Sequence, residues 1–188
     1  LLNAGATTAA AKYMDVERGL TTFGPVEGRE AERIRWGLHL ALLQGEFSRI
    51  AQATVPEGLG RSEVARAQNA IDFYKGLAEL SNPTGSASMA ERQFAKLSLR
   101  NPENFAYLVN LFAARLARLL GDNMFKRLDS ADLSAASEVM NTANNALENA
   151  LHVEDKDLAI HESNKALLLL AMGQHGAAYN VLQRVKSY

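Results

Sequence analysis

The sequence predicts an all-α protein made of antiparallel helical hairpins. Apolar residues recur at helical spacing, and no segment shows the strict alternation of a half-buried strand. Proline and glycine clusters fall between the helical segments, where they end one helix before the next begins. Hairpins of this kind stack either as a solenoid or as an irregular bundle, and both arrangements remain open.

The predicted helices follow one another with short connections. Four such connections contain the 4 prolines: "FGPVEG" (23–28), "TVPEGLG" (54–60), "SNPTGSAS" (81–88) and "RNPEN" (100–104). The spacing predicts helices near 3–22, 28–44, 46–54, 61–80, 87–99, 102–120, 131–151, 156–172 and 175–187, with a short turn near 123–128.

Particular residues support the helix ends. Asn101 can cap a helix that has Pro102 at its first position, and Ser88 with Glu91 has the spacing of a capping box. Gly121 and Gly173 follow apolar runs and are expected to end helices.

Composition excludes several classes of function. Apolar residues make up 47% and charged residues 22%, as in folded proteins, and the formal net charge of -1 offers no attraction to nucleic acid. The absence of cysteine removes disulfides, thiolate nucleophiles and cysteine zinc sites. No apolar run approaches the ~20 residues of a membrane span, so we expect no direct membrane insertion. A soluble chain of this kind suits the cytoplasm or the periplasm.

We expect residues 1–188 to form a single helical domain. The linker near 81–86 allows a subdivision into N-terminal hairpins (1–80) and C-terminal hairpins (87–188). Because the chain starts with Leu1, we expect it to be a processed form or a piece of a larger protein.

Three segments share a pattern of small and large apolar residues around a turn. "ALLLLAMGQHGAAYNVLQRV" (166–185) has small residues at Ala166 and Ala178 on either side of Gly173. Ala90, Phe94, Leu97 and Pro102 have the spacing of a second helix with its closing proline, and "WGLHLALLQGEFSRI" (36–50) repeats the turn with Ile50 at the small position. The pattern resembles the tetratricopeptide repeat (TPR), a hairpin of two antiparallel helices about 34 residues long, with small residues at fixed places and a proline near the end. The separations are irregular, so an irregular bundle stays the alternative.

No constellation of residues predicts catalysis. "GLGRSE" (58–63) lacks the lysine and spacing of a phosphate-binding loop, and no nucleophile elbow is present. Asp157 and His161 share a helix face, but a stable metal site needs three or four ligands. We therefore predict a protein that is not an enzyme and binds no cofactor or metal.

The TPR resemblance implies a concave groove that binds another protein or a peptide. On the first helices of the hairpins the groove would present Arg35, Trp36, His39, Ser163 and Asn164. A run of asparagines at 141–149 would add Asn141 and Asn145. Trp36 can instead pack in the core, and the asparagines can instead form a solvated face.

The predicted function is a non-catalytic interaction module: an adaptor, assembly factor or chaperone, here of bacterial type. The alternative is an all-helical sensory domain that binds a small ligand. "VERGLTTFG" (16–24) is similar to a stretch in some bacterial sensory domains of that kind. The sequence leaves the partner and the oligomeric state open.

Overall fold

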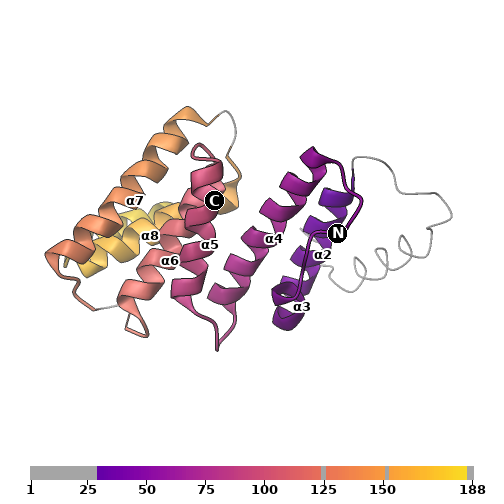
Figure 1. Ribbon diagram of the computed structural model, residues 1–188. Helices are drawn as coiled ribbons and strands as arrows, with labels where there is room; N and C mark the ends of the chain where they lie inside the picture. The colour runs from indigo at the N-terminus through magenta and orange to yellow at the C-terminus, as the bar shows by residue number, and fades with distance from the viewer. Residues whose placement is uncertain (1–28, 124–125, 151–152, 186–188) are drawn as a thin grey trace. The chain divides into compact units, whose positions relative to one another are not determined.

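The computed structural model describes residues 29–123, 126–150 and 153–185, and these residues form eight helices and no strand (Figure 1). The predicted all-α fold is confirmed. The helices are α2 (Glu30–Leu43), α3 (Phe47–Ala51), α4 (Arg61–Ser81), α5 (Ala87–Arg100), α6 (Phe105–Leu120), α7 (Ser130–Asn149), α8 (Asp155–Ala171) and α9 (His175–Val185). The helix predicted for 3–22 lies outside the described residues.

The chain divides into two compact units, Leu1–Gly85 and Ser86–Tyr188, so the division falls within the predicted linker. Asn82 organises the end of the first unit, because its side-chain Oδ1 accepts hydrogen bonds from the backbone N and the hydroxyl of Thr84. Gly85 follows, and its backbone N donates to the carbonyl oxygen of Asn82 at 2.8 Å. A Cβ at this position would overlap the backbone oxygen of Glu79, so the turn requires glycine.

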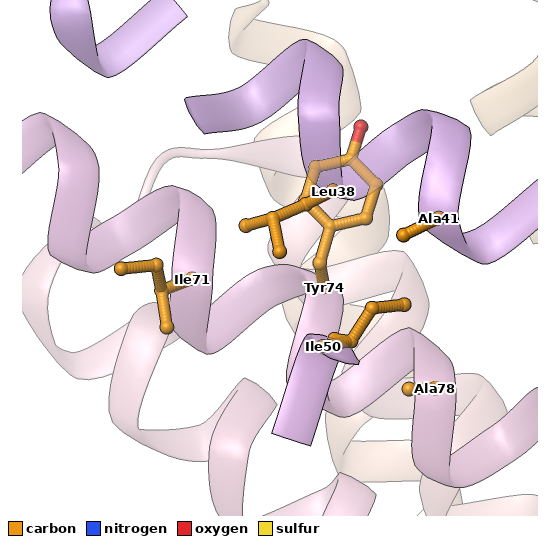
Figure 2. Packing of buried hydrophobic residues seen from close by; sticks show 6 residues of the cluster. All are labelled: Leu38, Ala41, Ile50, Ile71, Tyr74 and Ala78. Carbon is orange, nitrogen blue, oxygen red and sulfur yellow. The ribbon is translucent and has the colours of Figure 1, made fainter. Parts of the chain in front are cut away.

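In unit 1, helices α2 and α3 form a hairpin that packs against α4. The buried core consists of Leu38, Ala41, Ile50, Ile71, Tyr74 and Ala78 (Figure 2). Leu38 lies beside the ring of Tyr74, and Ile50 of the short helix α3 faces α4. Burial of each large side chain of this kind stabilises a fold by about 1.5–3 kcal/mol, so this small unit depends on a few residues.

In unit 2, helix α6 is the central element and packs against α5, α7 and α8. Its large apolar residues are deeply buried, as its position between three helices requires. The largest side chains in the unit that are less than 2% exposed are Phe94, Leu97, Val109, Phe112, Leu116, His161 and Leu168. Helix α9 packs on α8, with Ala166, Ala178 and Val181 at the contact. Ala166 and Ala178, the small residues on either side of Gly173, therefore lie where these two helices meet.

Two predicted helix caps are wrong. Helix α5 is capped by Ser86, whose hydroxyl accepts from the backbone N of Met89, and not by Ser88. Helix α6 is capped by Asn104, not Asn101, which caps the end of α5 instead. In both regions several capping residues stand close together, and sequence spacing alone does not decide between them.

Candidate functional site

The α2/α3 and α8/α9 hairpins share one turn. Gly45 and Gly173 have positive φ angles of 71° and 76°, which glycine adopts without steric cost. The nitrogens of Gly45 and Glu46 donate to the oxygens of Leu42 and Ala41, at 3.1 and 2.8 Å. The corresponding bonds of Gly173 and Gln174, to Leu170 and Leu169, measure 2.9 and 2.8 Å. These are the paired hydrogen bonds of a Schellman motif.

The common turn places the flanking residues in equivalent positions. Helices α3 and α9 each begin two residues after the glycine, at Phe47 and His175. Ile50 and Ala178, equivalent in this register, are both buried against the first helix of their hairpin. We therefore compare the two first helices, α2 and α8, position by position.

One face of α8 is buried along its whole length, whereas its counterpart on α2 is largely exposed. The buried residues on this face of α8 are Asp157, His161, Asn164, Leu168 and Ala171, whereas Ala166 is buried against α9. Their counterparts, here named the α2 outer face, are Arg29, Arg33, Trp36, Leu40 and Leu43. Of these, only Leu40 is buried; Trp36 is 38% exposed and Leu43 is 49% exposed.

Helix α6 lies against the buried face of α8. The ring of His161 meets the ring of Phe105 edge-on, with 5.4 Å between the centroids, and lies 6.3 Å from that of Phe112. One turn later, Asn164 Nδ2 donates to the backbone oxygen of Val109 at 3.2 Å. The position on α2 that is equivalent to Asn164 is Trp36. The same position is therefore buried in the α8/α9 hairpin and exposed in the α2/α3 hairpin.

The predicted residues Arg35, Trp36 and His39 lie together on α2. The guanidinium of Arg35 stacks over the indole of Trp36, 5.5 Å from the ring centroid. Trp36 meets His39 edge-on at 5.9 Å, and His39 meets Tyr74 of α4 at 6.0 Å. Trp36 contacts His39 but is 38% exposed to solvent, so the alternative that it packs in the core is wrong.

The other predicted residues lie in unit 2 and in different environments. Asn141 and Asn145 are exposed on α7, and Ser163 is half-buried on α8. Asn164 is 6% exposed and bonded within the core. Of the remaining asparagines in the run, Asn144 faces inward. The structure therefore brings together the trio on α2, but it separates Asn164 from the exposed asparagines.

Two ionisable side chains of α8 are buried with shifted pKa values. Burial lowers the pKa of His161, while Glu162 raises it and Lys165 lowers it. Burial also raises the pKa of Asp157, one turn earlier. Within the described ranges, no group of three or more histidines, aspartates and glutamates is placed to hold a metal ion.

A carboxylate clamp joins three helices of unit 2. Glu91 of α5 accepts hydrogen bonds from Arg115 Nε, at 2.8 Å, and from Arg118 Nε, both on α6. Arg115 also donates to the backbone oxygen of Ala135 on α7 at 3.1 Å. Burial raises the pKa of Glu91, but the bonds from Arg118 and Arg115 lower it by more, so its net pKa lies below the ordinary value. The arginine pair is thus engaged within the unit.

Sequence reasoning missed the pairing of His161 with Asn144 and of Asn164 with Val109. A signal existed in the spacing, since positions 157, 161, 164, 168 and 171 follow the alternating steps of four and three that mark one buried helix face. The first three positions are polar, which concealed the continuity of that face with Leu168 and Ala171.

Comparison of the chain with models of protein families, with curated proteins and with solved structures finds no match. Among the helices described, none combines the length and apolar character that crossing a membrane requires. The stretch 16–24, on which the expectation of a sensory domain depends, lies outside the described residues.

Proposed function

We propose that this protein is a non-catalytic interaction module that binds another protein through the α2 outer face. The observation that carries the proposal is the exposure of Trp36, with Arg35 stacked on it, at a position whose counterpart in α8 is covered by a helix. Tryptophan and arginine are the residues most enriched among those that dominate binding energy at protein interfaces.

The chemistry of this face suits a helix or peptide that carries an acidic residue beside an apolar one. Trp36 and Leu43 lie two helical turns apart and offer exposed apolar surface. Arg35, which borders this face and stacks on Trp36, offers a cation, and its planar guanidinium can form two parallel hydrogen bonds with a carboxylate. Stacking on the indole restrains that guanidinium before binding and so reduces the entropy lost on complex formation.

The covered face of α8 supports the same mode of binding. In unit 2 a helix, α6, fills the position that is exposed on α2, and it does so with ring packing and one hydrogen bond to a backbone oxygen. A partner helix that lies on α2 in this way would bury Trp36 and Leu43. The mechanism is binding without a chemical step, and the partner's residues opposite Trp36 and Arg35 would determine specificity.

An affinity pull-down with matched variants tests this function. The baits are the native chain, Arg35→Glu, and Leu99→Ser as a control that removes an apolar side chain 85% exposed on α5. We expect a protein retained by the native and Leu99→Ser baits and lost from Arg35→Glu. Retention by all three baits, or by none, would contradict the proposed face.

A small-ligand sensor, the alternative function, predicts a different result. A thermal-shift screen of the native chain with small anions and metabolites would then give a saturable rise in melting temperature. Such a rise, unchanged by Arg35→Glu, would favour the sensor over the interaction module.

A further inference from the structure

A polar contact in the core of unit 2 joins three helices at His161. The ring is 0% exposed, and its Nε2 lies 2.8 Å from Oδ1 of Asn144 on α7. Phe105 and Phe112 of α6 pack beside it. Because the amide oxygen of Asn144 only accepts hydrogen bonds, Nε2 carries the proton in this contact. The neutral ring therefore has its other nitrogen, Nδ1, unprotonated.

Nδ1 of His161 is buried and has no hydrogen-bond partner among the residues that the structure describes. In the neutral ring this atom is only an unpaired acceptor. Once protonated, it becomes a buried charged donor with no acceptor, in a ring that packs beside Phe105 and Phe112. Burial of an unpaired charged group costs far more free energy than burial of an unpaired neutral one. Protonation of His161 therefore destabilises the packed arrangement of α6, α7 and α8.

The charged groups near His161 do not remove this conflict. On α8 itself, Glu162 raises the pKa of His161 and Lys165 lowers it, so these two act in opposite directions. Glu162 forms an ion pair with Arg184 of α9 at 3.0 Å, and the positive charge of Arg184 offsets part of the attraction between Glu162 and a protonated ring. Asp157 lies one turn before His161 on the same helix.

The helices packed against α8 add little charge at this point. Helix α6 presents Phe105 and Phe112 to the ring, and its two arginines, Arg115 and Arg118, are bound to Glu91 of α5. Helix α7 presents the neutral amide of Asn144. The acidic residues of α7 are Asp132, Glu138 and Glu148, of which Glu138 and Glu148 are exposed.

We propose that His161 is an acid-sensitive latch, whose protonation at Nδ1 by solvent loosens α8 from α6 and α7 while unit 1 stays folded. The proton binds the nitrogen lone pair and forms one N–H bond, so no other reactant is needed. Loosening of α8 exposes Nδ1 to water, which can accept its hydrogen bond. The latch is independent of the α2 outer face, because it lies wholly within unit 2.

The direction of the effect follows from the lowered pKa of His161 in the folded protein. The unfolded ring has a pKa of about 6.5, so above this value both states are neutral and the stabilisation is fully present. It is lost as the pH falls through the lower pKa of the folded state. One proton changes the opening constant by at most about tenfold per pH unit. Asp157 has the opposite effect on stability. Because its pKa is raised in the folded protein, protonation of Asp157 stabilises the folded state as the pH falls through that raised pKa.

Amide hydrogen exchange in the complete chain measures the latch. We compare the opening constants of α8 amides with those of α4 amides at about pH 7 and about pH 5, corrected for the intrinsic exchange rate. In the native chain we expect the opening of α8 to increase severalfold, and by no more than about thirtyfold over this interval, with little change in α4. His161→Gln should abolish this increase, whereas His175→Gln, a change at an exposed histidine of α9, should retain it.

An equal increase in native and His161→Gln chains would overturn the proposal, as would parallel opening of α4 and α8. If His161→Gln fails to fold, a second measurement tests the proposal without it: the titration of the His161 ring by NMR in the native protein. The latch requires that the ring of His161 titrate below the ordinary histidine pKa of about 6.5. A ring that titrates at or above about 6.5 without any loss of α8 protection would also overturn it.

Discussion

Trp36 and Asn164 occupy the same position in two hairpins with the same turn, yet Trp36 is 38% exposed and Asn164 is 6% exposed. Asn164 is held by the backbone oxygen of Val109, and Trp36 carries the guanidinium of Arg35 on its ring. The contrast separates a residue that holds the fold together from one that is available to a partner, and the two roles predict different effects of mutation.

Asn164→Ala should lower the free energy of unfolding by about 1–2 kcal/mol, because the buried hydrogen bond to Val109 is lost. The neighbouring Ser163→Ala is the control, since Ser163 is half-buried, and it should change the value by less than about 0.5 kcal/mol. Urea denaturation followed by circular dichroism measures both. Equal effects of the two changes would show that Asn164 does not have the structural role assigned to it.

Three glycine substitutions test the common turn. Gly45→Ala and Gly173→Ala should each destabilise the protein by about 1 kcal/mol, because alanine is strained at positive φ. Gly37→Ala is the matched control: this glycine is inside α2, and a Cβ there meets no atom within 4 Å. It should stabilise the protein by about 0.5–1 kcal/mol, since alanine favours the helix. Thermal unfolding measures the three melting temperatures. Shifts of the same sign in all three variants would contradict the assignment of a shared glycine turn at Gly45 and Gly173.

The clamp at Glu91 predicts a dependence on pH. Since the pKa of Glu91 is below its ordinary value of 4.5, its stabilisation is present above that value and is lost as the pH falls through the lower pKa of the folded state. Glu91→Gln should therefore cost about 1–2 kcal/mol near pH 7 and much less near pH 3. Urea denaturation of both chains at the two pH values gives the difference between their free energies of unfolding. His161 is present in both chains, so its contribution cancels in that difference. A difference that does not change with pH would exclude the charged clamp.

The local part of the fold could be predicted from the sequence. Helical periodicity placed α4 within a residue of its observed ends, and Gly173 predicted a helix end because its conformation is a local property. The helix caps were less certain, as Ser86 and Asn104 show, because neighbouring polar residues compete for the same role.

The contacts between helices could not be predicted in the same way. Asn144 and His161 are 17 residues apart, and Asn164 and Val109 are 55 apart, so their pairing depends on how α6, α7 and α8 pack. Arg35, Trp36 and His39 were identified as a group because they are neighbours on one helix. Whether that group binds a partner is a property of its exposed surface, which only an interaction measurement can test.

The affinity of a recovered partner for the native chain and for Arg35→Glu is the most direct test of the proposed function. Isothermal titration at low and high salt would give the dissociation constants, with melting temperatures confirming that both chains are folded. We predict at least about tenfold weaker binding by Arg35→Glu and a smaller salt dependence, because one close charge pair is lost. Equal dissociation constants for the two folded chains at both salt concentrations would contradict binding at the α2 outer face.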